Sequence, residues 1–341
     1  MKRISDPIKL FESIRNIIEE SRKRVAFTVN SELTVLYWKV GQLIAENILN
    51  KSRAGYGEEI IENLSKSLLN HFGKGWSKQQ LWNCIRTAEI FADEKILYAL
   101  SRELSWTHIR ILIFIDNDVK REFYMQMCRI EKWSTRQLSE RIDSMLFERT
   151  AISKKPDKLV HQELTELSNK NKLTPDLVFK DPYFLDFLGL TDTFSEKDLE
   201  SAIIVSIQQF LLELGCDFAF VARQKRIVID NEDHFIDLLF FHRALNRLIA
   251  IDLKIGKFKA AYKGQMELYL KWIDKYERKV NEDTPLGLIL CSELSPEKIE
   301  LLELNNGQIR VASYLTTLPS KEILNQKLLL AIETAKSKIK D

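Results

Sequence analysis

The segments Phe235-Ile-Asp-Leu-Leu-Phe-Phe241 and Leu248-Ile-Ala-Ile-Asp-Leu-Lys254 decide the fold of the second half of this chain. Both are short apolar runs rich in isoleucine, leucine and phenylalanine, a composition that favours strands. Residues 243–246 lie between them and predict a tight turn. The two segments therefore predict an antiparallel hairpin.

The predicted hairpin brings two carboxylates together. If it folds about the midpoint of Ala244 and Leu245, Asp237 lies opposite Asp252, and Lys254 points to the same face as Asp252. Opposed residues on antiparallel strands have Cβ atoms roughly 4.5–5.5 Å apart. Two like charges at that distance repel each other, so the pattern predicts a divalent metal between them with a lysine beside it.

The composition indicates a soluble globular protein. The chain has 341 residues, 45% hydrophobic and 29% charged, which is enough for two or three domains. A net charge of +2 does not by itself indicate a nucleic-acid partner, so local basic clusters must carry that case.

The four cysteines are scattered without a CxxC pair, which predicts buried thiols in a reducing compartment. No apolar run approaches the roughly 20 residues of a bilayer span, and the charged start does not resemble a secretory signal. We therefore expect a cytoplasmic protein without a membrane partner.

Residues 1–150 are predicted to form an all-α domain, because apolar residues recur at helical spacing. The expected helices cover residues 8–49, 58–71, 105–115, 118–130 and 133–149. Gly73-Lys-Gly75 breaks the pattern and Ser77 resembles an N-cap, an arrangement typical of a helix-turn-helix or winged-helix module. Lys78 and Arg86 would then contact DNA. The alternative is a polar face on an ordinary helical bundle.

A polar shift over residues 151–176 predicts a linker, and residues 177–341 form the second predicted domain. Its elements follow the order α-β-β-β-α-β, which predicts a mixed sheet with helices on its faces. The expected helices and strands are 196–214, 218–229, 235–241, 248–255, 260–276, 285–291 and 309–314.

That order resembles the core of the PD-(D/E)xK, or restriction-endonuclease-like, nucleases. Asp237 and Asp252-Leu-Lys254 resemble their signature, although a carboxylate–x–lysine string alone is weak. Gln265 and Tyr269, one turn apart on a helix, resemble the Q-x-x-x-Y element of the RecB-like branch. Glu200 matches the acidic residue that many members contribute from their first core helix.

The strand before Asp237 adds two candidate substrate-binding residues. Folding about the midpoint of Asn231 and Glu232 would place Arg226 opposite Asp237, with Gln224 on the same face. Polar side chains on one face of an apolar sheet are costly to bury without partners. A buried ion-pair network without catalysis is the alternative interpretation.

The chain also resembles the YhcG-like family of nucleases over nearly its full length. The resemblance rests on strings such as Asp181-Pro-Tyr-Phe, Ile236-Asp-Leu-Leu-Phe-Phe-His and Leu104-Ser-Trp-Thr-His108. It implies a helical N-terminal domain with a DNA-binding or interaction role, followed by a PD-(D/E)xK domain. One departure is Asp252 where the family usually has glutamate, so a shorter side chain must reach the metal.

The resemblance implies an endonuclease that hydrolyses phosphodiester bonds in DNA with Mg²⁺ or Mn²⁺. Asp237, Asp252 and the Leu253 carbonyl would hold the metal, and Lys254, Glu200, Gln265 and Tyr269 would complete the catalytic set. Alternatives are a structure-specific or RNA-directed nuclease and a non-catalytic binding or scaffold protein with an inactive nuclease fold. A regulator that acts through the first domain alone is a third alternative. The long N-terminal helices favour a homodimer.

Overall fold

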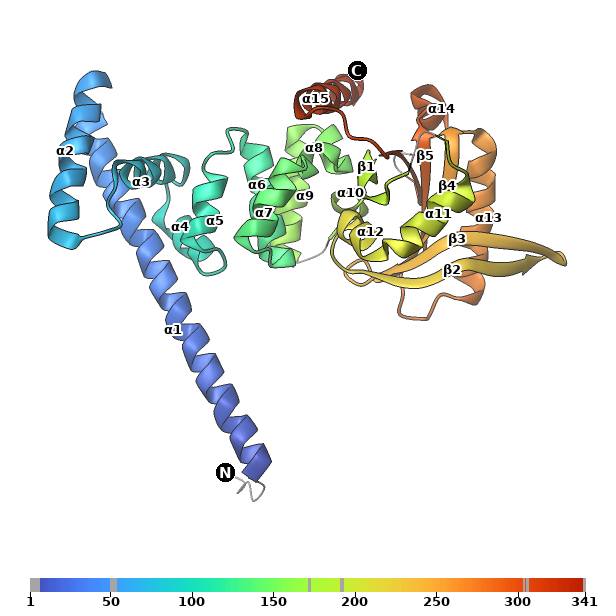
Figure 1. Cartoon of the computed structure of the whole chain (residues 1–341), viewed down its shortest axis with the longest axis horizontal. Coiled ribbons are helices and arrows are strands. Elements are labelled where there is room, and N and C mark those ends of the chain that lie inside the picture. The colour runs from blue at the N-terminus through green and yellow to red at the C-terminus, as the bar shows by residue number, and fades with distance from the viewer. Residues whose placement is uncertain are drawn as a thin grey trace. The chain divides into compact units, whose positions relative to one another are not determined.

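The computed structural model of the chain describes residues 7–49, 54–170, 173–190, 193–302, 304 and 307–339. The chain divides into two compact units, Met1–Glu140 and Arg141–Asp341. Figure 1 shows helices in the first unit and a sheet flanked by helices in the second. None of the described helices combines the length and the apolar composition that a bilayer span requires.

Unit 1 is helical, as its periodicity predicts. The order is α1 (Pro7–Ile44), the π-helical segment η1 (Ala45–Leu49), α2 (Ala54–Phe72), α3 (Lys78–Ile90), α4 (Glu94–Ser101), α5 (Trp106–Leu112), α6 (Asp118–Glu131) and α7 (Thr135–Asp143), which crosses into unit 2. The predicted N-cap at Ser77 is confirmed, because its hydroxyl accepts a hydrogen bond from the Gln80 N–H. Residues 7–49 and 54–149 contain no strand, so the described part of this unit has no β-wing.

The long first helix packs tightly against α3 at a glycine. A Cβ placed on Gly41 would lie 1.9 Å from the carbonyl oxygen of Cys84, so only glycine allows this approach. Glycine in a helix interior costs about 1 kcal/mol relative to alanine. The close contact between α1 and α3 explains why the helical pattern contains a glycine here.

Two predicted helices are broken in the structure. The single helix expected over residues 133–149 is wrong, because α7 ends at Asp143 and α8 (Leu146–Arg149) begins after Met145, which has a left-handed φ of 53°. The helix expected over residues 196–214 divides at Ser206 into α11 (Glu196–Val205) and α12 (Ile207–Leu214). Apolar periodicity continues across both breaks, so it gave no sign of them.

The described residues of unit 2 form one six-stranded sheet in the order β1-β6-β5-β4-β3-β2. Its strands are β1 (Tyr183–Phe184), β2 (Phe218–Ile229), β3 (Glu232–His242), β4 (Arg247–Lys257), β5 (Leu286–Glu293) and β6 (Ile309–Leu315). Strands β2, β3 and β4 pair antiparallel, whereas β4, β5, β6 and β1 pair parallel. The predicted mixed sheet is therefore confirmed, with the two-residue strand β1 added to it.

Helix α13 (Ala260–Tyr276) covers the sheet at the parallel crossover between β4 and β5. Its Met266, Leu270 and Ile273 are buried in the main core with Ile289 of β5. A Cβ on Gly287 would lie 2.5 Å from the Met266 side chain, so the helix and strand approach closely at this glycine. This contact sets the distance between α13 and the sheet, and therefore the position of the polar residues of α13 relative to the strands.

The predicted register of the β2–β3 hairpin is wrong by two residues. Arg226 pairs with Phe235 and Lys225 with Ile236, so Gln224, not Arg226, is in register with Asp237. The turn is made by Asp230 and Asn231, whose φ values of 50° and 64° suit a two-residue type I′ turn. The predicted fold point lay one residue further along the chain.

Residues 151–176, whose composition predicts a linker, contain regular structure. They form η2 (Ala151–Lys154), α9 (Asp157–Lys170) and the start of α10 (Pro175–Val178). Val160, Leu164 and Leu167 of α9 are buried. The polar residues of this segment therefore lie on the exposed faces of short helices. The remaining elements of unit 2 are η3 (Asp186–Leu188), α14 (Pro296–Leu301) and α15 (Lys321–Ile339).

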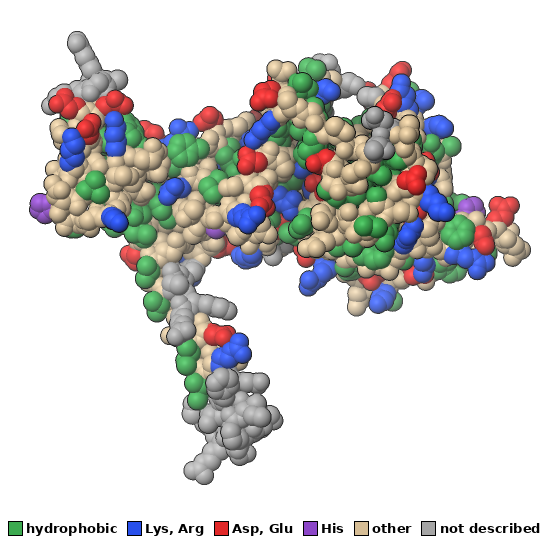
Figure 2. Space-filling model, in the orientation of Figure 1, with side chains coloured by type: hydrophobic (Ala, Val, Ile, Leu, Met, Phe, Trp, Pro, Cys, Tyr) green, Lys and Arg blue, Asp and Glu red, His purple; other side chains and the backbone are tan. Residues whose placement is uncertain are grey.

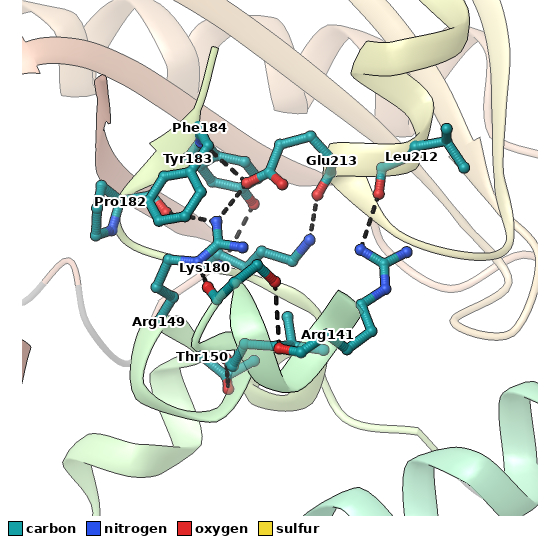
Figure 3. A network of polar contacts seen from close by, with 11 residues as sticks. Arg141, Arg149, Thr150, Lys180, Pro182, Tyr183, Phe184, Leu212 and Glu213 are labelled. Atoms are coloured by element: carbon teal, nitrogen blue, oxygen red, sulfur yellow. Dashed lines mark hydrogen bonds and ion pairs between the residues drawn. The ribbon is translucent and has the colours of Figure 1, made fainter. Parts of the chain in front are cut away.

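A buried polar network, which we call the Arg149 cluster (Arg149, Lys180 and Glu213), joins α8, the segment before β1 and α12 (Figure 3). Arg149 is fully buried, and its Nη1 donates to Glu213 Oε1 at 2.5 Å. Lys180 Nζ donates to the Glu213 carbonyl, and the Phe184 N–H donates to Glu213 Oε1 at 3.0 Å. Burial alone would raise the pKa of the Glu213 carboxyl, but the charges of Lys180 and Arg149 outweigh it and lower that pKa.

Candidate active site

The hairpin β3–β4 places Asp237 beside Asp252, the two residues that we call the acid pair. Leu238 pairs with Ile251 and Leu239 with Ala250, so the next position of the register joins Asp237 to Asp252. This is the register that the sequence predicts. Asp237 Oδ2 accepts a hydrogen bond from the Leu253 N–H at 2.8 Å, which fixes the carboxylate against β4.

Lys254 lies next to the acid pair. Its Nζ is 2.9 Å from Asp252 Oδ2, and the Asp252 residue is only 2% exposed. A carboxylate oxygen can accept more than one hydrogen bond, so the buried Oδ2 keeps acceptor capacity beyond its contact with Lys254. On its other side Nζ lies 5.5 Å from the centre of the Tyr262 ring, a cation–π arrangement.

Burial controls the ionisation of this group. It raises the pKa of the Asp252 carboxyl to about 7, with Lys254 opposing the rise and the charge of Asp237 adding to it. Burial also raises the pKa of Asp237, against the Leu253 N–H and Lys254. For Lys254 burial favours the neutral amine, but the charges of Asp252 and Asp237 outweigh it and raise the pKa. The site therefore holds more negative charge than one lysine neutralises.

Gln224 connects the acid pair to Glu200. The Gln224 Nε2 donates to Glu200 Oε2 at 2.5 Å and to Asp237 Oδ1 at 3.1 Å. Its backbone has a φ of 45°, an unusual left-handed value for a residue within a strand. Arg223 forms an ion pair with Glu200 Oε1, so both oxygens of this buried carboxylate are engaged.

Gln265 and Tyr269 come to the same site from α13. Gln265 Nε2 donates to Tyr269 Oη at 2.6 Å, as expected for residues one helical turn apart. Burial raises the pKa of the Tyr269 phenol, and the charges of Asp252, Lys254 and Asp237 also act on it. The phenol thus lies close enough to feel the acid pair and its lysine.

The other predicted substrate-binding residues have different surroundings. Arg226 is exposed and forms an ion pair with Asp233 at 2.9 Å, because the hairpin register moves it away from Asp237. In unit 1, Arg86 donates to the Ile113 carbonyl at 2.6 Å and to Asp116 at 2.7 Å, so its guanidinium fastens the turn after α5. Lys78 lies in the first turn of α3 and is half-buried.

The structure adds residues that the sequence patterns did not reveal. Alternation along β2 would put Arg223 and Gln224 on opposite faces, but the bulge near Ala222 and the left-handed Gln224 let both reach Glu200. Glu196 accepts from the Ile255 N–H at 3.2 Å and also acts on the pKa of Lys254. Tyr262 could have been found, since it lies one and two turns before Gln265 and Tyr269.

The donor chemistry of the acid pair fits a hard divalent cation. Among the described residues, no three histidine, cysteine or acidic side chains gather into a ready-made metal site. Two facing carboxylates with a spare buried oxygen are nevertheless the ligands that Mg²⁺ prefers, and Mg²⁺ usually keeps several waters. Glu200 lies beyond the Gln224 amide and would need to exchange partners to join them.

Comparisons with known proteins show which family the chain resembles. A family model described as the YhcG PDDEXK nuclease domain matches residues 176–329, and one described as the DUF1016 N-terminal domain matches residues 13–149. The protein named "Putative nuclease YhcG" of Escherichia coli K12 is 32% identical over 316 residues, covering 84% of this chain and 83% of the relative.

A solved structure, a repair endonuclease from Pyrococcus abyssi, aligns with 36% of this chain and 49% of its own length. The sequence identity is 15% and the TM-score is 0.27. A likeness of this extent does not define the fold, which rests on the sheet topology and on the family match.

Proposed function

Because this chain belongs to the YhcG family, whose C-terminal domain is a PDDEXK nuclease domain, we propose that it is an endonuclease that cleaves DNA with Mg²⁺ or Mn²⁺. The observation that supports this proposal most strongly is the acid pair, in which Asp252 is buried and lies 2.9 Å from Lys254 Nζ. When both carboxylates are ionised, the acid pair carries more negative charge than Lys254 neutralises, and a divalent cation of the kind used in phosphodiester hydrolysis would balance it.

Asp237, Asp252 and the Leu253 carbonyl would hold the cation, which makes a water more acidic and polarises a phosphate oxygen. Asp237 is positioned for this by the Leu253 N–H, and Asp252 by its place opposite Asp237 on β4. Because Asp252 has a shorter side chain than glutamate, the close pairing of β3 and β4 must bring its carboxylate to the cation.

Lys254 would act as a charged group. The acid pair raises its pKa, so the ammonium keeps its proton near neutral pH and suits stabilisation of charge on a phosphorane-like transition state. The same ammonium can orient the attacking water by donating a hydrogen bond to it. Abstraction of a proton would require the neutral amine, which the two carboxylates disfavour.

Four further side chains would position this machinery. Gln265 and Tyr269 form a hydrogen-bonded unit close enough for the acid pair and Lys254 to act on the Tyr269 pKa, and this unit would orient the scissile phosphate or Lys254. Gln224 holds Glu200 at a fixed place relative to Asp237. Arg223 is 39% exposed at its side chain while paired with Glu200, so it can contact a substrate phosphate.

The test is cleavage of supercoiled plasmid, linear duplex, branched DNA and RNA by the purified protein with Mg²⁺, Mn²⁺ or EDTA. Lys254→Met keeps an apolar stem of similar length and should reduce cleavage by about 10²–10³-fold, the loss typical of a transition-state contact. Lys257→Ala is the matched control, since Lys257 is exposed on the same strand and should cleave as well as wild type.

Cleavage of RNA but not DNA would show that the substrate is RNA and would contradict the proposed DNA endonuclease. Metal-independent cleavage, or full activity of Lys254→Met, would contradict the site itself. A protein that binds DNA but cleaves none of the substrates with any metal would identify an inactive nuclease fold.

A further inference from the structure

Helix α1 has two faces of different character. One face packs against its own unit: Thr34, Val35 and Trp38 are buried, and the indole N–H of Trp38 donates to the Phe91 carbonyl at 2.6 Å. Asn30 on the same side donates to the carbonyls of Ser101 and Leu104. These contacts fix the C-terminal half of α1 and orient the rest of the helix.

The opposite face carries an exposed apolar row, which we call the α1 stripe. Its eight members are between 38% and 64% exposed and are Ile14, Ile17, Ile18, Val25, Val29, Leu33, Leu36 and Leu43. Figure 2 shows hydrophobic side chains along the part of α1 that extends beyond the other helices of its unit. Contiguous apolar patches larger than a few hundred Å² mark interaction sites.

The spacing of the α1 stripe indicates the shape of what covers it. Ile14, Val25 and Leu36 are eleven residues apart, and Ile18 and Val29 repeat the same interval. An eleven-residue repeat gives 3.67 residues per turn, close to the 3.6 of a straight helix, so the row stays nearly parallel to the axis. It continues for about 44 Å at 1.5 Å per residue, a length that suits another long helix.

We infer that the α1 stripe is a self-association surface, covered by α1 of a second copy of this chain lying antiparallel to it. In an antiparallel pair centred on residue 27, Ile18 faces Leu36 and Val25 faces Val29. Two identical patches related by a two-fold axis form the isologous contact of common homodimers. This inference does not rest on the proposed nuclease activity.

Charge selects the antiparallel orientation. Glu32 lies on the same side of the helix as the α1 stripe and is exposed. A parallel pair in register would oppose Glu32 to Glu32, whereas in the antiparallel pair centred on residue 27 the two Glu32 positions lie ten residues, about 15 Å, apart along the axis. The flanking charges are of both signs, as in the Arg15–Glu19 ion pair, whereas an anionic lipid surface calls for a basic face.

The available area is large enough for a stable dimer. Eight half-exposed aliphatic side chains each present on the order of 100 Å², which approaches the roughly 800 Å² per partner of a standard interface. Most neighbouring members of the α1 stripe lie three, four or seven residues apart, about one or two helical turns, so side chains of the second helix can fill the gaps between them.

The first experiment measures the mass of the full-length protein by light scattering over a range of concentrations. Wild type is expected to be a dimer, whereas Ile18→Lys and Val29→Lys should be monomers with unchanged helix content by circular dichroism. Asn16→Lys is the matched control, because Asn16 is exposed on the side of α1 away from the stripe and should remain a dimer. A monomeric wild type, or a dimeric Val29→Lys, overturns the inference.

The second experiment tests the orientation by disulfide formation in a Cys216→Ser background, because the other three cysteines are buried. The double variant Ile18→Cys with Leu36→Cys should form a covalent dimer on oxidation. Ile18→Cys alone should not, because in the antiparallel pair its partner is Leu36. Efficient crosslinking of the single variant would contradict the antiparallel arrangement.

Discussion

Unit 2 contains two buried groups of charged side chains whose ionisation behaves in opposite ways. In the Arg149 cluster, Arg149 and the Phe184 N–H donate to the Glu213 carboxylate, Lys180 donates to the Glu213 carbonyl, and the pKa of the carboxyl is lowered. In the acid pair two carboxylates share one lysine, and both carboxyl pKa values are raised. The Arg149 cluster holds more positive charge than its carboxylate neutralises, which keeps that carboxylate ionised. The acid pair, when both carboxylates are ionised, holds more negative charge than Lys254 neutralises, which leaves a place for a cation.

The largest expected effect is on stability, in the Arg149 cluster. Glu213→Gln leaves the fully buried Arg149 without its counter-charge, so we expect a loss of about 3–5 kcal/mol in the free energy of unfolding, measured with urea. Glu140→Gln, which breaks the exposed ion pair with Arg136, is the control and should change little. Equal effects of the two substitutions would show that the cluster is not a structural anchor.

The second prediction concerns metal binding at the acid pair. Mg²⁺ or Mn²⁺ should raise the melting temperature of wild type, because a ligand at 100 times its Kd adds about 2.7 kcal/mol to the stability of the folded state. Asp237→Ala and Asp252→Ala should show no such rise. If Asp252→Ala were stabilised as strongly as wild type, the cation would bind elsewhere.

The third prediction uses a buried group that stays neutral. Burial lowers the pKa of His242 to about 4 from 6.5, and its Nδ1 accepts from the Leu245 N–H. The unfolded chain therefore binds the proton first, so this residue should remove about 2 kcal/mol of stability between pH 8 and pH 5. His242→Asn keeps a nearby acceptor and should flatten that part of the pH profile; the exposed His71→Asn should not.

The fourth prediction concerns the metal-free acid pair. The Asp252 pKa rises from 3.8 in the unfolded chain to about 7, so its ionisation costs stability as the pH rises through that window, and the whole cost applies above it. In EDTA at pH 8, Asp252→Asn should stabilise the protein by on the order of 1–2 kcal/mol, and in Mg²⁺ the same variant should lose cleavage. Asp283→Asn, at an exposed carboxylate, should do neither.

The smallest expected effect distinguishes two neighbouring arginines of β2. Arg226→Ala should leave both cleavage and the urea midpoint unchanged, because its ion pair with Asp233 is exposed. Arg223→Ala should lower cleavage about tenfold, equivalent to about 1.4 kcal/mol of transition-state stabilisation. If Arg226→Ala lowered cleavage and Arg223→Ala did not, the result would favour the β2–β3 register predicted from the sequence, in which Arg226 lies opposite Asp237.

The sequence predicted the β3–β4 hairpin because both strands are apolar and a short polar turn separates them, which leaves one register. It failed on β2–β3, where four polar residues, Asp230 to Asp233, allow several turn positions. The conformation of Gln224 was also beyond reach, because a left-handed glutamine within a strand has no residue pattern. As a result, the sequence named Gln224 for the right site but with the wrong neighbour.

Other differences arise from contacts between distant segments. The two-residue strand β1 exists because Tyr183 pairs with Tyr314 on β6, far along the chain. The polar segment 151–176 is structured because the apolar positions of α9 find a core that local composition does not show. The positions of the candidate site residues on regular strands and helices could therefore be predicted, whereas register, breaks and boundaries depended on tertiary structure.

The close approach of α1 to α3 at Gly41 means that a small change at this residue would alter the direction of the whole first helix. Ile14 lies 27 residues from Gly41, a distance of about 40 Å along the axis. A side chain at position 41 would tilt the helix, and a tilt of only about 5° moves the far end by about 3.5 Å over that length. One methyl group near the middle of unit 1 would thus be amplified into a displacement of most of a helical turn at the far end of the molecule's longest helix.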